Sequence, residues 1–189
     1  HTVHITELGE PAFLGMAFNA ASEADLGVIS ELDGASDVLD NDEPCGGKKV
    51  ILTDPDGLKV EIIHGINKLE AIPVKEVTPF NSGSRRRRVG PIVRSYPRPS
   101  QIKRLGHIVL RCGDFKGCEE FYRNKLGMLV SDFLYRGEED NPGDNAAEFL
   151  RCNRGQEYTD HHTILVTDAD EAGLGHVAFE VEDWNDLSV

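Results

Sequence analysis

A β-α-β-β-β order that occurs twice is the feature of this sequence that most limits its fold. The first unit begins with an apolar run, "FLGMAFNA", and continues into a helical pattern, "SEADLGVISELDG", in which Ser22 is the expected N-cap. We expect Val28, Ile29 and Leu32 on the buried face of this helix and Gly34 at its end. Three short β-type runs follow, "ASDVLD", "KKVILTD" and "LKVEIIHG", with a "PDG" turn before the last.

The same order returns in the second half of the chain. "GHIVLRC" predicts a strand, "DFKGCEEFYRNKLG" predicts a helix, and "MLVSDFLY", "AAEFLRCN" and "HHTILVTD" predict three more strands. The expected buried face of the helix consists of Phe115, Cys118, Phe121, Tyr122 and Leu126. A third copy begins at "LGHVAFEVEDWNDL". The period predicts an α+β chain built from repeated β-α-β-β-β units.

A proline-rich segment separates the two units. Residues 66–103 contain five of the nine prolines and have almost no helical or strand periodicity. We therefore expect three parts, which are an amino-terminal part at 1–65, a semi-rigid linker at 66–103 and a carboxy-terminal part at 104–189.

Composition excludes several classes of function. A formal charge of −13 opposes non-specific binding to nucleic acid phosphates, and no apolar run approaches the roughly 20 residues of a membrane span. The basic run Arg85 to Arg88 is expected to be a solvated part of the linker, with an anionic-ligand patch as the alternative. The four cysteines lack the CxxC spacing, which favours reduced thiols and a cytoplasmic location.

Histidines carry the chemical signal. Three of the seven histidines fall between positions 161 and 176, and His107, His162 and His176 each lie at or near the start of an expected strand. Imidazoles from neighbouring strands of one curved sheet can converge in a pocket, and neutral imidazole is a ligand for Fe, Zn, Cu and Ni. A histidine on a strand is also often a structural polar residue, and spacing alone does not decide between the two.

The stretch "RLGHIVLRCGDFKGCEEFYRNKLGMLVSDF", with "EFLRCN", "HHTILV" and "GHVAFEVED", resembles the carboxy-terminal module of type I extradiol ring-cleavage dioxygenases. These enzymes belong to the vicinal oxygen chelate superfamily, and the likeness is greatest to the 2,3-dihydroxybiphenyl 1,2-dioxygenase branch. "DPDGLKVEIIHG" and "VTPFNSG" resemble the end of the family's metal-free amino-terminal module. The resemblance implies curved mixed sheets of the glyoxalase-like kind.

The resemblance also implies roles for individual residues. His107 and His176 match two ligands of a catalytic Fe(II), for which Mn(II) is an alternative. His162 matches the acid/base, and Val109 and Phe149 match substrate-pocket positions. His161 matches no ligand, and strand alternation is expected to turn its side chain to the opposite face from that of His162. The implied reaction cleaves a catechol ring next to the diol with O2, in an enzyme that is a homo-oligomer.

The third ligand of the family is a late glutamate, which is expected beyond Val189. Glu61 occupies a similar "DPDG-x-x-x-E" motif in the first unit, but the matching strand position there is Gly15, so we expect a structural carboxylate. Because the family builds each module from two units, a chain incomplete at both ends is expected, or one completed by a second chain. Two alternatives are a metal-dependent glyoxalase-like isomerase or epimerase, and a non-catalytic module that binds an aromatic ligand.

Overall fold

The computed structural model describes residues 6–73, 79–94, 99–138 and 141–187 of the chain. Clustering of the backbone separates two compact units. The larger unit comprises the first repeat up to Lys68 and residues 106–178, and it contains every residue of the expected site. The smaller unit comprises residues 69–105 and 179–189, together with the amino terminus.

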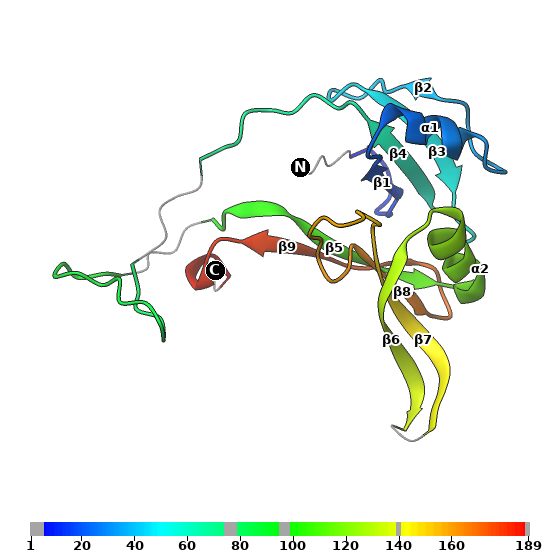
Figure 1. The fold of residues 1–189 in the computed structure, drawn as a ribbon. Helices are drawn as coiled ribbons and strands as arrows, with labels where there is room; N and C mark the ends of the chain where they lie inside the picture. Colours follow the sequence, from blue (N-terminus) through cyan, green and yellow to red (C-terminus); the bar gives the residue numbers. More distant parts are fainter. Residues whose placement is uncertain (1–5, 74–78, 95–98, 139–140, 188–189) are drawn as a thin grey trace. The chain divides into compact units, whose positions relative to one another are not determined.

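The first repeat forms a four-stranded sheet in the order β1-β4-β3-β2 (Figure 1). Its strands are β1 (Gly15–Asn19), β2 (Leu39–Asp40), β3 (Lys48–Thr53) and β4 (Lys59–His64). β1 runs parallel to β4, and β3 pairs antiparallel with both β4 and β2. The strands predicted from "KKVILTD" and "LKVEIIHG" are thus confirmed, whereas only two residues of "ASDVLD" pair.

Helix α1 (Glu23–Ser30) packs on β3 and β4. Its predicted N-cap is confirmed, because Ser22 accepts a hydrogen bond from the amide of Asp25 while the Asp25 carboxylate accepts one from the amide of Ser22. The predicted buried face is partly wrong. Val28 is 68% exposed and Leu26 is fully buried, because the less exposed face runs through Leu26 and Ile29, three residues apart, and leaves Val28 outside it.

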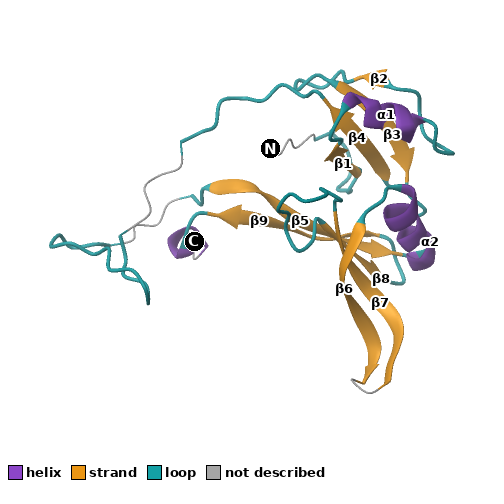
Figure 2. Cartoon of the chain, in the orientation of Figure 1, coloured by secondary structure: helices purple, strands orange, loops and turns teal. Residues whose placement is uncertain are grey.

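The second repeat lies in a five-stranded sheet in the order β6-β7-β8-β5-β9 (Figure 2). Its strands are β5 (Ile102–Cys112), β6 (Leu129–Glu138), β7 (Asn141–Arg151), β8 (Ile164–Asp168) and β9 (Gly173–Val181). β5 runs parallel to β8, as β1 runs parallel to β4 in the first sheet. In both repeats the first strand therefore pairs with the last, which confirms the repeated unit.

The predicted second helix is two helices in series. α2 (Phe115–Glu119) continues as the π-helix η1 (Glu120–Lys125), and a short helix α3 (Trp184–Leu187) follows β9. Phe115, Cys118, Phe121 and Tyr122 are buried as expected. Short π-helical segments are rare and occur often near functional sites.

The turn between β3 and β4 docks onto the second repeat. The Tyr122 hydroxyl donates to Asp54 Oδ2 at 2.8 Å, and the backbone amides of Gly113 and Asp114 donate to the Asp56 carboxylate at 3.0 and 2.9 Å. A Cβ added at Gly117 would lie 3.0 Å from Pro55 Cβ, so this glycine gives the turn room to approach α2. The two repeats are thus joined by one buried hydrogen bond, between Tyr122 and Asp54, and by exposed hydrogen bonds to Asp56.

Replacing Tyr122 by phenylalanine should lower the free energy of unfolding by about 1.5 to 3 kcal/mol, the usual range for a hydrogen bond to a charged group. Tyr122 and Asp54 are both buried, at 0% and 4% exposure, so no water can replace the hydrogen bond that the carboxylate loses. Urea denaturation measures the change. Tyr158→Phe is the matched control, because Tyr158 is fully exposed and should give no shift. An equal loss in both variants would contradict the assigned role.

Between β4 and β5, the described residues contain no helix or strand, as expected for the linker. The division at 65/66 and 103/104 stays a prediction. Within the described part of the chain, no helix combines the length and apolar character that crossing a bilayer requires.

Candidate metal and acid/base site

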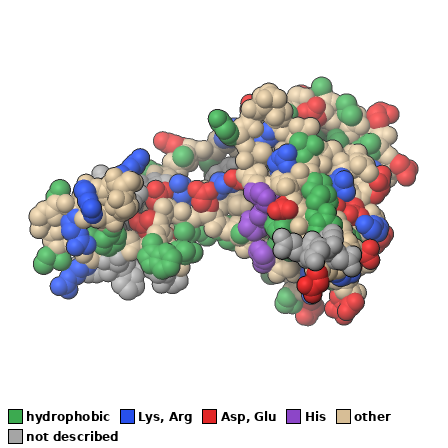
Figure 3. Space-filling model, turned by 60° about the horizontal axis from the view of Figure 1, so that its bottom comes forward, with side chains coloured by type: hydrophobic (Ala, Val, Ile, Leu, Met, Phe, Trp, Pro, Cys, Tyr) green, Lys and Arg blue, Asp and Glu red, His purple; other side chains and the backbone are tan. Residues whose placement is uncertain are grey.

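Three strands of the second sheet bring three histidines together. His107 lies on β5, His176 lies on β9, and His162 precedes β8, the neighbour of β5 on its other side. His107 Nε2 is 3.2 Å from His176 Nε2, and the rings of His107 and His162 have centroids 4.2 Å apart. In the space-filling view, histidine side chains form one exposed patch (Figure 3). The predicted convergence is therefore present in the structure.

The positions along the strands differ from the prediction. His107 is the sixth residue of β5 and His176 the fourth of β9, so neither begins its strand. β5 starts earlier than expected, because residues 102–105 extend it. The alternation of faces does hold, since Ile108, Leu110 and Cys112 are buried while His107 and Val109 are half-buried on the other face.

The His107 and His176 side chains suit a shared metal ion. Two imidazole nitrogens bound at right angles to one ion, each about 2.1 Å away, would lie about 3 Å apart. The observed separation of 3.2 Å matches this spacing, and both ring nitrogens face one another without a carboxylate between them. Among the described residues, no carboxylate oxygen lies within 4.8 Å of a ring nitrogen of both histidines in a group of three possible ligands.

His161 lies on the same side as His162, contrary to the prediction. Its Nδ1 is 3.2 Å from His162 Nδ1, and both rings meet the edge of Phe149, with centroids 5.4 and 4.9 Å away. The reason is local backbone structure. β8 begins only at Ile164, so residues 161–163 form a bend in which the alternation rule does not apply.

Phe149 and Val109 line the histidine cluster. Phe149 projects from β7, next to β8, and stacks edge-on against both adjacent histidines. Val109 Cγ1 would lie 2.9 Å from a Cβ at Gly175, so the glycine before His176 lets β9 approach β5 closely. Phe149 is thus an apolar neighbour of two histidines, and the pocket role of Phe149 and Val109 stays a prediction.

Burial and neighbouring imidazoles lower the pKa of His107 and of His162. Burial lowers the pKa of His107, and the neighbouring His176 lowers it further. Burial also lowers the pKa of His162, with His107 and His161 adding to the effect. Asp160 opposes both shifts and was missed at the sequence level, although it directly precedes the histidine pair. Neutral imidazoles can accept a proton or bind a metal ion.

Glu61 forms ion pairs with lysines, and the arginine run is exposed. Glu61 is buried and lies 3.4 Å from both Lys49 Nζ and Lys59 Nζ, as expected for a structural carboxylate. Arg85 to Arg88 are exposed, and the amides of Arg87 and Arg88 donate to Asn81 Oδ1.

A second ionisable cluster lies on β7 beside the π-helix. Glu148 is fully buried, and its Oε1 accepts hydrogen bonds from Arg123 at 3.0 Å and Asn145 at 2.8 Å. Burial, followed by a hydrogen bond with Glu119, raises the pKa of Glu148 to about 7. Burial acts to raise the pKa of Glu119 too, but hydrogen bonds with Glu148 and Lys116 outweigh it and lower that pKa. The shared proton therefore resides on Glu148.

The Glu148 pKa predicts a pH-dependent stability. Because the folded-state pKa of Glu148, about 7, lies above the ordinary glutamate pKa of 4.5, the native state holds a proton that the unfolded chain has lost between these values. Stability should fall as pH rises through this window, by about 3 kcal/mol at most. The lowered pKa of Glu119 has the opposite effect at lower pH, where stability should rise as the pH rises. Urea titrations at several pH values should show that Glu148→Gln lacks the decline, whereas parallel curves would contradict the assignment.

Comparison with known proteins relates this fold to a superfamily. Residues 104–188 match the family model described as the Glyoxalase/Bleomycin resistance protein/Dioxygenase superfamily. Metapyrocatechase 2 from Cupriavidus necator is 25% identical over 162 residues, which are 85% of this chain and 46% of the relative.

Two solved structures share the fold. The Mn(II)-bound glyoxalase from Novosphingobium aromaticivorans gives a TM-score of 0.65 at 22% identity, covering 91% of this chain and 47% of the glyoxalase. The 2,3-dioxygenase LapB from Pseudomonas sp. KL28 gives 0.63 at 18% identity, covering 94% and 57%. The chain spans about half the length of these relatives. Residues 104–188 are thus similar to the Glyoxalase/Bleomycin resistance protein/Dioxygenase superfamily, and the chain has an α+β fold of open, curved sheets.

Proposed function

We propose that the protein is a non-haem Fe(II) extradiol dioxygenase, which cleaves the ring of a catechol next to the diol with O2. The observation that carries the proposal is the pair of facing nitrogens, His107 Nε2 and His176 Nε2 at 3.2 Å, with the His162 ring beside them. Two imidazoles with a carboxylate from elsewhere and open positions are typical of oxygen-activating ferrous sites. The likeness to a metapyrocatechase supports the same class.

His107 and His176 would hold the ion, with Mn(II) as an alternative to Fe(II). When bound, the ion supplies electron transfer between a catechol and O2 that share its open positions. The protein contributes position, since the two ligands come from adjacent strands β5 and β9 and keep their spacing through the sheet.

His162 would move the protons. Its Nδ1 faces His161 Nδ1, which leaves Nε2 to accept the proton of a catechol hydroxyl and to return it later in the reaction. The lowered pKa of His162 favours the neutral, proton-accepting form at neutral pH.

Phe149 and Val109 would bind the aromatic ring and exclude water from it. Both are apolar and half-buried, and Phe149 already meets a histidine ring edge-on at 4.9 Å. An apolar wall of this kind favours a catechol with a bulky 3-substituent, such as a 2,3-dihydroxybiphenyl-like compound. A homo-oligomeric state and a cytoplasmic location stay predictions.

A glyoxalase-like isomerase or epimerase is the second candidate, favoured by the TM-score of 0.65 to the Mn(II)-bound glyoxalase. Such a reaction uses a carboxylate as proton shuttle and consumes no O2. A binding module without chemistry is the third candidate. It would bind an aromatic ligand without holding a stoichiometric metal ion.

Oxygen consumption tests the proposal directly. Purified protein, loaded anaerobically with Fe(II), is mixed with 2,3-dihydroxybiphenyl or catechol in air-saturated buffer, and O2 uptake is followed together with the absorbance of the ring-cleavage product. One O2 per catechol is expected. Uptake no faster than that of free Fe(II), or anaerobic isomerisation of a hemithioacetal instead, would overturn the dioxygenase assignment.

A further inference from the structure

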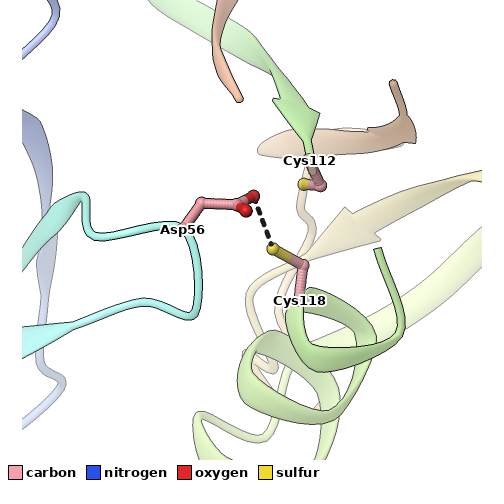
Figure 4. Close-up of side chains that lie close together, drawn as sticks. All are labelled: Asp56, Cys112 and Cys118. Carbon is pink, nitrogen blue, oxygen red and sulfur yellow. Dashed lines mark hydrogen bonds between the residues drawn. The ribbon is translucent and has the colours of Figure 1, made fainter. Parts of the chain in front are cut away.

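Two thiols and a carboxylate meet where the first repeat docks onto the second. Cys112 lies at the end of β5, Cys118 lies on α2, and Asp56 lies in the turn between β3 and β4 (Figure 4). Cys118 Sγ donates to Asp56 Oδ2 at 3.4 Å, and one ligand atom from each of the three residues lies within 4.8 Å of the others. Cys112 and Cys118 lie 56 and 62 positions after Asp56 in the chain, so only folding brings the three residues together.

We propose that Asp56, Cys112 and Cys118 form a second metal site, which binds a thiophilic divalent cation of the zinc class and joins the two repeats. The site is separate from the histidine cluster and does not depend on the reaction proposed above. Thiolate sulfur and carboxylate oxygen together select Zn(II), Cd(II) or Co(II) over Mg(II) and Ca(II). Three protein ligands leave a fourth position for water.

The spacing of the ligand atoms supports this assignment. A tetrahedral zinc ion with sulfur about 2.3 Å away holds its ligand atoms about 3 to 4 Å apart. The observed span of at most 4.8 Å needs only small side-chain rotations to reach that range. Cys112 and Cys118 are 1% and 0% exposed, and Asp56 is half-buried, so its carboxylate connects the site to the surface.

The local charge also favours a cation. The Cys118 thiol has a raised pKa, caused first by its hydrogen bond with Cys112, then by burial and by the carboxylates of Asp56 and Asp54. The two carboxylates beside this thiol, Asp56 and Asp54, also attract a divalent ion. Binding would replace the two thiol protons, which leave to solvent, by one cation.

The chain provides a matched test, because its four cysteines divide into this pair and the distant Cys45 and Cys152. The Cys45→Ser/Cys152→Ser double variant keeps only the proposed ligands. Anaerobic titration with Co(II) should give a near-ultraviolet sulfur-to-cobalt charge-transfer absorption in this variant and in the wild type, because histidine ligands produce none. Apparent Co(II) affinity should rise with pH, by up to about a hundredfold per unit for two released protons.

Single variants then assign the ligands. Cys112→Ser and Cys118→Ser should lose the absorption, and Asp56→Asn should bind Co(II) at least about tenfold more weakly. Absence of the charge-transfer band in the double variant would overturn the proposal, and so would its persistence in Cys118→Ser. The Cys45→Ser/Cys152→Ser double variant keeps all three proposed ligands. Its charge-transfer absorption therefore tests the site even if a variant of one of the ligands fails to fold.

Discussion

Replacing His176 by alanine should abolish stoichiometric Fe(II) binding and, with it, ring cleavage. The remaining imidazole of His107 would hold the ion through one nitrogen, where the native pair presents two at 3.2 Å. Mutation of a residue that only hydrogen-bonds to a metal ligand typically weakens metal affinity ~10–100-fold. Loss of a ligand itself should weaken the affinity more. His107→Ala should have the same effect, because the two residues act on one ion.

Metal content after anaerobic loading and desalting, measured by mass spectrometry of the metal, gives the readout. His64→Ala is the matched control. That histidine lies on β4, where its Nδ1 is 3.2 Å from the Ala20 carbonyl, and it takes no part in the cluster. Circular dichroism checks that each variant folds. Full iron content in folded His176→Ala would remove His176 from the ligand set.

His162→Ala should separate proton transfer from metal binding. We expect kcat to fall by about 10²- to 10⁴-fold, the usual contribution of a positioned acid/base, while iron content stays near that of the wild type. The ring of His162 packs beside His107 with centroids 4.2 Å apart and is not one of the two facing nitrogens, so its loss leaves the pair in place.

Turnover and iron content measured on the same preparation decide the outcome. A drop in iron equal to the drop in kcat would mean that His162 is a ligand, and unchanged kcat would show that His162 is not the acid/base. His161→Ala tests the neighbouring histidine, whose Nδ1 lies 3.2 Å from His162 Nδ1 and whose ring meets that of His162 edge-on. A change in the pH profile without loss of iron would indicate that His161 orients the His162 ring.

The repeat, the main strands and the three converging histidines could be predicted because they depend on local pattern. The strand β3 and the cap at Ser22 follow from alternation and hydrogen-bonding chemistry that a few neighbouring residues determine. The resemblance of "HHT" and "GHVAF" to a known family added roles that periodicity alone does not give.

Other features could not be predicted because they depend on contacts between distant residues. Cys112 and Cys118 have no metal-binding spacing, and Asp56 reaches them only through docking of the two repeats. His161 was misplaced because β8 starts at Ile164, later than the apolar pattern suggests. The π-helix η1 was not expected either, since its residues favour an ordinary helix equally well.

Docking through the β3–β4 turn has a consequence for how the chain folds. The bond from Tyr122 to Asp54 spans 68 positions, and the bond from Cys118 to Asp56 spans 62. Contacts this far apart in sequence carry a large loop-closure entropy and are formed late, which is typical of slow folding. Until they form, the surfaces that the two repeats bury against each other stay exposed to solvent, so nascent or heated chains have their greatest tendency to aggregate before the repeats meet.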